Sequence, residues 1–147
     1  MPDIVLSFLK GLSYITKHTH VFTLHNEIFS RDPQVVEAMN NDPLIHGESQ
    51  PVQTAKVMID ASSRLNEEFL LIKLPVLILH GTEDKATNPS GSQFFYDNAG
   101  STDKTLKLYE GHYHDLLNDL DKEVVMADIN DWIDERVPAM RTKSVAR

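Results

Sequence analysis

An uninterrupted apolar run near the middle of the chain is its clearest pattern. Residues Val76 to Leu79 are consecutive branched apolar residues, without the polar alternation of a strand that faces water on one side. Such a run predicts a strand buried on both faces, typical of a parallel sheet covered by helices. Gly81 ends the run, and Asp84 follows shortly afterwards. Sites in open α/β sheets form at the carboxyl ends of strands, so Asp84 is a candidate site residue; the alternative is that it only caps the next segment.

A second stretch, over residues 105–109, ends in a similar way. It alternates in polarity and is rich in β-forming residues, and Gly111 marks a turn before His112 and His114. Two strands thus lead into loops that carry an acid in the first case and histidines in the second. We therefore predict an α/β fold with two neighbouring parallel core strands and flanking helices. In this fold the carboxylate of Asp84 should lie within hydrogen-bond reach of a ring nitrogen from the second loop, that of His112 or that of His114.

Apolar residues at steps of three and four predict helices on both sides of the two strands. The expected helices cover residues 4–15, a short segment that starts at Asp32 and Pro33, a longer one capped by Ser49, one from Asn88 to Gly100, and one over residues 121–137. No convincing core strand precedes Gly47. We therefore divide the chain into a helical segment (residues 1–48), for which a cap above the sheet and a generic helical subdomain are the two interpretations, an α/β core (residues 49–140) and a disordered tail (residues 141–147).

Composition and charge narrow the classes of function. The 147 residues carry a formal net charge of −8, which argues against nucleic acid as a partner because phosphate binding needs clustered Lys and Arg. The absence of cysteine excludes disulfides and a thiolate nucleophile. No apolar run is long enough to span a membrane, and no basic leader precedes the first apolar residues. We therefore expect no transmembrane segment and a cytoplasmic protein.

Three histidines that lie close together, His18, His20 and His25, raise the question of a metal site. Catalytic zinc needs three protein ligands in a fixed geometry, and the sequence has no His-Glu-x-x-His helix. We therefore expect no metal and no cofactor, and interpret these histidines as part of a polar cap surface.

Four stretches resemble one known family. They are His-Gly-Thr-Glu-Asp at residues 80–84, the strand and histidine loop at residues 104–114, Ser-Arg-Asp-Pro at residues 30–33 and Asn-Asp-Pro-Leu at residues 41–44. Together they are similar to the C-terminal half of the monoacylglycerol lipase-like branch of the α/β-hydrolase superfamily, which is grouped with serine aminopeptidase (S33)-type hydrolases. The resemblance implies that Asp84 is the acid and His114 the base of a Ser-Asp-His triad, with Glu83 and His112 as the competing acid and base.

The nucleophile that such a triad needs has no counterpart in the sequence. The family's serine lies in a Gly-x-Ser-x-Gly elbow, and none of Ser49, Ser90 and Ser92 has that context. The family's sheet is also larger than this chain allows, so we expect its N-terminal half, including the backbone donors of the oxyanion hole, to be absent. A truncated gene, a complementing subunit or a remnant kept for binding would each explain such a sequence.

The expected function is that of a serine-hydrolase fragment of the carboxylic ester or monoacylglycerol lipase type, which supplies an acid and a base and is inactive alone. Its partner would be a small acyl-ester substrate once the missing half completes the fold. The cap should then leave an apolar cavity beside the histidine loop. The alternative is a non-catalytic α/β fragment or subunit that binds a partner or an apolar ligand. In both cases the open sheet edge predicts self-association.

Overall fold

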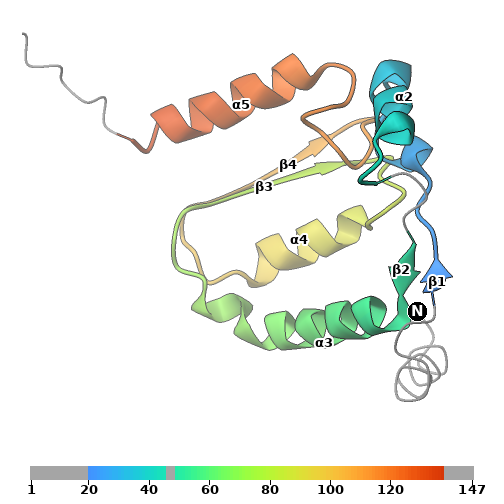
Figure 1. Cartoon of the computed structure of the whole chain (residues 1–147). Helices are drawn as coiled ribbons and strands as arrows, with labels where there is room; N and C mark the ends of the chain where they lie inside the picture. Colours follow the sequence, from blue (N-terminus) through green and yellow to red (C-terminus); the bar gives the residue numbers. More distant parts are fainter. Residues whose placement is uncertain (1–19, 46–48, 138–147) are drawn as a thin grey trace, which may run out of the picture.

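A computed structural model describes residues 20–45 and 49–137 of the chain. The helix expected over residues 4–15 and the tail expected over residues 141–147 lie outside these described residues. In the described part, a two-stranded parallel sheet lies between helices (Figure 1). None of the described helices is both long enough and apolar enough to cross a membrane.

The central sheet consists of β3 (Val76–Gly81) and β4 (Lys104–Tyr109), which run parallel. Val76 lies opposite Lys104, and Gly81 lies opposite Tyr109 at the carboxyl ends. This arrangement confirms the two neighbouring parallel strands predicted from the sequence. The burial of β3 is less complete than its apolar run suggested, because Ile78 is buried while its neighbours are half-buried. Among the described strands, β3 is hydrogen-bonded to β4 alone, which leaves its second edge open.

Helices cover both faces of this sheet. Figure 1 shows α5 (Lys122–Asp134) on one side of the strands, and α4 (Pro89–Asn98) with α3 (Val52–Glu68) on the other. The core under α5 contains Val125 and Tyr109, which pack with Leu116 and with the partly buried Leu79 and Ile129. On the opposite side, η2 (Phe69–Leu71) follows α3 and contacts α4 through aromatic side chains.

Two of the predicted helix starts are confirmed and one is wrong. Asp32 accepts a hydrogen bond at the start of α2 (Pro33–Asn41), and Asn88 does the same for α4. Ser49 does not cap α3, since β2 (Gln50–Pro51) intervenes and Pro51 is the N-cap residue. The reason is that proline holds the residue before it in an extended conformation, which suits the pairing of β2 with β1 (His20–Phe22).

The cap residues lie near the carboxyl ends of the sheet. Figure 1 shows α2 beside the arrowheads of β3 and β4, with β1 and β2 running along the same side. A short 3-10 helix, η1 (Asn26–Ile28), precedes α2 and packs against it. The last helix, α5, is shorter than the predicted 121–137. It begins after Asp121, because this residue adopts a left-handed conformation with φ of 61°, and it ends at Asp134. The boundary between cap and core at residue 48 stays a prediction.

Candidate acid–base site

The carboxyl ends of β3 and β4 bring together two loops, the acid loop (residues 82–88) and the histidine loop (residues 110–121). Asp84 and His114 face each other across these loops, with His114 Nδ1 2.8 Å from Asp84 Oδ2. A carboxylate only accepts hydrogen bonds, so Nδ1 carries the hydrogen and Nε2 is the ring nitrogen that can take up a proton. The Asp84 side chain is 2% exposed and that of His114 is 38% exposed. The acid is therefore buried, and the base is accessible.

The loops approach this closely because β3 ends in a glycine. Thr82 N–H donates to Tyr109 O at 2.9 Å, and Glu83 N–H donates to His112 O at 3.0 Å. A Cβ on Gly81 would lie 2.2 Å from His112 O, which no side chain tolerates. Gly81 therefore lets the histidine loop pass against the end of β3, and the backbone bonds hold it there.

Asp84 is kept ionised by a dense set of donors. Its Oδ1 accepts from the N–H groups of Ala86 at 2.7 Å and Thr87 at 2.9 Å, and its Oδ2 accepts from the Thr87 hydroxyl at 2.7 Å besides His114. Burial by itself raises the pKa of Asp84, but the hydrogen bonds from Thr87, His114 and Ala86 outweigh it and lower the pKa to about 2. At neutral pH Asp84 can therefore stabilise an imidazolium on its partner.

This lowered pKa predicts a pH-dependent contribution to stability. Because the pKa of Asp84 falls from 3.8 to about 2 on folding, the ionised carboxylate stabilises the fold fully above pH 3.8, and this stabilisation is lost as the pH falls through about 2. We expect the difference in free energy of unfolding between the wild type and Asp84→Asn to be constant near neutral pH and to shrink between about pH 4 and pH 2. Urea denaturation at several pH values measures this difference. A difference that does not vary with pH would contradict the assignment.

A second histidine, which sequence reasoning did not single out, also reaches Asp84. His80 belongs to β3, and its Nε2 lies 3.0 Å from Asp84 Oδ2, while its Nδ1 lies 2.7 Å from Ser92 Oγ on α4. The Ser92 hydroxyl is thus engaged with His80. Thr87, another donor to Asp84, was also missed. The signal available for His80 was a polar side chain at the end of an apolar strand, which needs a partner when buried.

The competing residues lie apart from the pair. His112 is buried at 8% exposure, with its ring against Tyr109 and its Nδ1 3.2 Å from Glu110 O. Its Nε2 has no hydrogen-bond partner among the described residues. The Glu83 side chain is exposed. The geometry thus brings His114, and not His112, to Asp84; the catalytic role of the pair stays a prediction.

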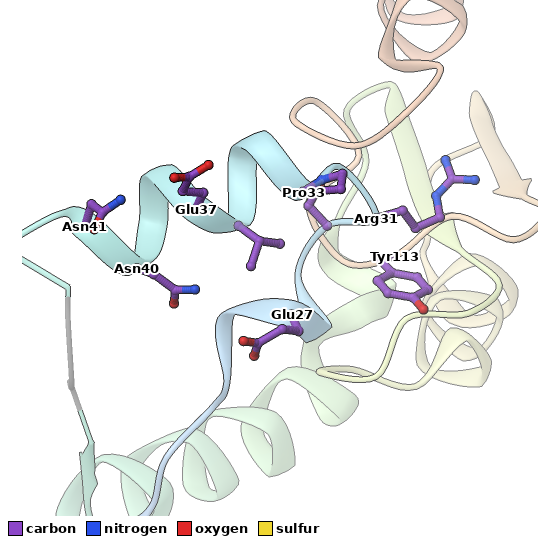
Figure 2. A pocket seen from close by; sticks show the side chains of 9 residues that line it. Glu27, Arg31, Pro33, Glu37, Asn40, Asn41 and Tyr113 are labelled. Carbon is purple, nitrogen blue, oxygen red and sulfur yellow. The ribbon is translucent and has the colours of Figure 1, made fainter.

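A cavity of about 680 Å³ opens beside the histidine loop, between η1, α2 and Tyr113 (Figure 2). Its walls are formed by Glu27, Ser30, Arg31, Pro33, Val36, Glu37, Asn40, Asn41 and Tyr113. Carboxylates and amides share this lining with apolar side chains. The apolar cavity expected from the sequence stays a prediction.

No group of three His, Cys, Asp or Glu side chains within residues 20–45 and 49–137 could hold a metal ion. Of the three histidines considered above, His18 and the side chain of His20 lie outside the described residues. His25 is the residue before η1 and makes no side-chain cap hydrogen bond there.

Comparison with known proteins places this site in a family. Residues 1–121 match the family described as serine aminopeptidase, S33. The chain belongs to this S33 family. This membership confirms the resemblance found in the sequence, and it accounts for the order of the two loops, with the acid loop after one strand and the histidine loop after the next.

Relatives of this S33 family member include esterases and lipases. This chain is 34% identical over 117 residues to the caffeoylshikimate esterase of Arabidopsis thaliana, a match that covers 78% of this chain and 35% of the esterase. It is 29% identical over 133 residues to the monoacylglycerol lipase of Mycolicibacterium smegmatis, and this match covers 90% of this chain and 48% of the lipase.

A solved structure of a lipase also resembles this chain. The monoacylglycerol lipase of Paleococcus ferrophilus superposes with a TM-score of 0.78 at 29% identity, and the match covers 90% of this chain and 52% of that chain. The S33 family member is thus an α/β-hydrolase of the monoacylglycerol lipase-like type, as the sequence predicted. It spans between about a third and a half of the length of these relatives.

Proposed function

We propose that this S33 family member supplies the acid and the base of a carboxylic-ester hydrolase. The observation that carries the proposal is the 2.8 Å contact between Asp84 and His114 at the carboxyl ends of two parallel strands. In acyl transfer by a Ser-Asp-His triad, the base takes the serine proton on one ring nitrogen while the acid holds the other. The two ring nitrogens of His114 fit these two roles. Nδ1 is hydrogen-bonded to Asp84, and Nε2 is free to accept the serine proton because the side chain is exposed.

The proposed substrate is a small acyl ester, such as a monoacylglycerol. The support for this class comes from the relatives, which are an esterase and two monoacylglycerol lipases. What these relatives share is action on carboxylic esters, and this is the substrate class that we propose.

We further propose that a second segment of the α/β-hydrolase fold completes the site. The sequence contains no Gly-x-Ser-x-Gly elbow, and none of the described strands pairs with the second edge of β3. Leu70, Leu71 and Leu74, which lead into β3, are also exposed. Without a companion segment, the same edge is the surface through which we propose that the chain self-associates. Analytical ultracentrifugation measures the mass of the particle: we expect oligomers of the chain alone, and a complex of the chain with its companion when the companion is added.

The experiment that tests the function is complementation. The 147-residue chain alone is expected to hydrolyse neither p-nitrophenyl esters nor monoacylglycerol above a no-enzyme control, because its sequence contains no Gly-x-Ser-x-Gly elbow and we propose that the oxyanion donors belong to the companion segment. The part of the Mycolicibacterium smegmatis lipase that lies outside its match to this chain is then added as a second polypeptide. We expect hydrolysis to appear, together with labelling of the added polypeptide by a fluorophosphonate probe.

Variants of the proposed pair provide the controls for this experiment. Asp84→Asn and His114→Ala should each reduce the complemented rate by about 10³-fold or more, because the serine would lose its base or the base its orientation. Labelling of Ser49, Ser90 or Ser92 in the chain alone, abolished by His114→Ala, would show that the chain holds its own nucleophile. A complex that forms without hydrolysis or labelling would favour the non-catalytic alternative.

A further inference from the structure

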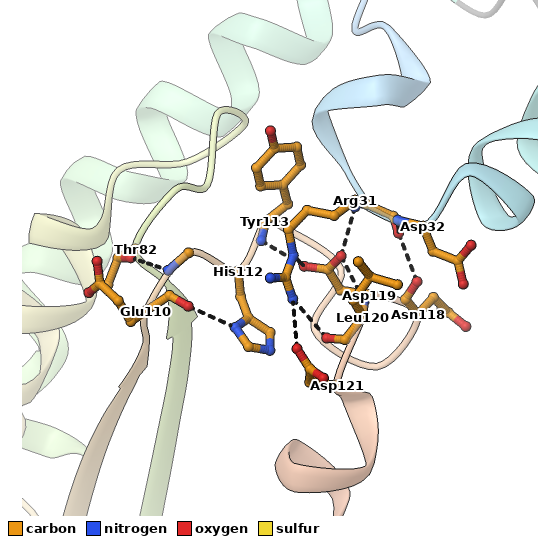
Figure 3. Close-up of polar contacts among 12 residues, drawn as sticks. Arg31, Asp32, Thr82, Glu110, His112, Tyr113, Asn118, Asp119, Leu120 and Asp121 are labelled. Atoms are coloured by element: carbon orange, nitrogen blue, oxygen red, sulfur yellow. Dashed lines mark hydrogen bonds and ion pairs between the residues drawn. The ribbon is translucent and has the colours of Figure 1, made fainter.

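A fully buried acid joins the cap to the histidine loop. The Asp119 side chain is 0% exposed, yet its carboxylate accepts four hydrogen bonds (Figure 3). The donors are the backbone N–H groups of Arg31 at 2.7 Å, Tyr113 at 2.9 Å and Leu120 at 2.9 Å, and the Nε of Arg31 at 2.8 Å. Burial raises the pKa of Asp119, but these bonds outweigh it and lower the pKa below its ordinary value. Asp119 is therefore a buried carboxylate that holds two parts of the chain together.

The cap side of this joint consists of residues 29–31. Besides its bonds to Asp119, Arg31 donates from Nη2 to Leu120 O at 2.8 Å. The buried Ser30 donates from its hydroxyl to Asn118 O at 2.9 Å. Residues 29–31 are thus bound to the histidine loop through both backbone and side-chain groups, although the two segments are 88 positions apart in sequence.

These contacts fix the residues on both sides of His114. The preceding residue, Tyr113, donates its N–H to Asp119, and the following residue, Asp115, donates its N–H to Phe29 O at 2.8 Å. Between them, the His114 ring meets the edge of the Phe29 ring, with centroids 5.4 Å apart and planes at 72°. Three consecutive residues of the histidine loop therefore each contact either Asp119 or the cap.

We propose that Arg31 and Asp119 are positioning residues for the base: by docking residues 29–31 onto the histidine loop, they hold the His114 ring with Nδ1 toward Asp84. The importance of this for catalysis rests on the proposed function, whereas the joint itself needs no substrate. The cap residues 29–31 are then part of the support of the base rather than a lid that moves freely over it.

The test compares two arginines that make the same kind of bond. Arg31→Ala removes the two guanidinium bonds of the joint, from Nε to Asp119 and from Nη2 to Leu120 O. Arg136→Ala is the matched control, because Arg136 has the same 23% exposure and binds Asp103 through Nε at 2.8 Å and Nη2 at 2.7 Å. Asp103 lies at the opposite end of β4 from His114. Two-bond ¹H–¹⁵N spectra of the neutral imidazole then report the tautomer of His114 directly, without any activity measurement.

In Arg31→Ala we expect the Nδ1–H tautomer of His114 to fall from nearly all molecules to less than about half, with no change in Arg136→Ala. In the complemented enzyme, Arg31→Ala should lower kcat about 10²-fold with KM little changed, since a misplaced base slows the reaction step. Arg31→Lys, which keeps the positive charge beside Asp119 but not the guanidinium, should restore part of the Nδ1–H population. An unchanged tautomer in both alanine variants, or equal changes in both, would overturn the proposal. If complementation yields no activity, the tautomer still decides this inference separately from the proposed function.

Discussion

Replacing Asp119 with alanine is expected to lower the free energy of unfolding by about 3 kcal/mol, the size of loss seen when one partner of a buried ion pair is removed. The substitution leaves the N–H groups of Tyr113 and Leu120 without an acceptor and the Arg31 guanidinium without its buried counter-charge. Folding removes water from these groups, and without the carboxylate no partner replaces that water. Guanidinium denaturation at neutral pH, followed by circular dichroism, measures the change in the midpoint and in the extrapolated free energy.

A second aspartate provides the control for this prediction. Asp60 pairs with Lys56 on α3, but its side chain is 45% exposed, so Asp60→Ala should cost less than about 1 kcal/mol. The same substitution is thus made at a buried and at an exposed ion pair. Equal losses of unfolding free energy in the two variants would show that the burial of Asp119 does not increase the contribution of its ion pair to stability. A loss below about 1 kcal/mol for Asp119→Ala would contradict the role assigned to its four hydrogen bonds.

The parts of the fold that could be predicted are those with local signals. The apolar run that became β3 and the alternating run that became β4 each carry their strand pattern within a few residues, and glycines mark their ends. Because parallel neighbours present their carboxyl ends at one edge of a sheet, the meeting of Asp84 and His114 could be predicted without coordinates. The choice between His114 and His112 was implied by the resemblance to a family rather than by the pattern.

The parts that could not be predicted depend on partners distant in sequence. Nothing in the local pattern distinguishes Asp119 from the other aspartates of its loop, because its burial is created by Arg31, 88 positions earlier. His80 likewise reads as the end of a strand, and its contact with Ser92 depends on how α4 packs. The prediction that Ser49 caps a helix was wrong for a different reason. Serine is a good capping residue, but Pro51, two residues later, imposes an extended backbone before it and so delays the start of the helix. The local pattern therefore predicted that the Asp84 loop and the histidine loop meet, and the resemblance selected His114, whereas the residues that hold this pair required the fold.

Gly81→Ala is expected to disrupt both the fold and the acid–base pair. A Cβ at this position would meet three backbone atoms at once, His112 O at 2.2 Å, Tyr113 O at 2.4 Å and His112 C at 2.6 Å. Backbone atoms cannot rotate away as a side chain can, so the histidine loop must move off the end of β3. We expect a loss of about 3 kcal/mol in the free energy of unfolding, at the upper end of what overpacking costs.

The displacement that relieves this clash also determines what happens at the site. The loop residues that would be pushed away directly precede His114, so the 2.8 Å contact with Asp84 should open, and the tautomer of His114 should no longer be held as Nδ1–H. Gly91→Ala is the matched control: nothing lies within 4 Å of a Cβ there, and the position is inside α4, where alanine should stabilise by about 0.5–1 kcal/mol. Denaturation curves and ¹H–¹⁵N spectra of both variants measure the two effects. A Gly81→Ala protein that keeps wild-type stability and the Nδ1–H tautomer would show that the histidine loop does not need the close approach at the end of β3, and the loop contacts would then lose their role in placing the base.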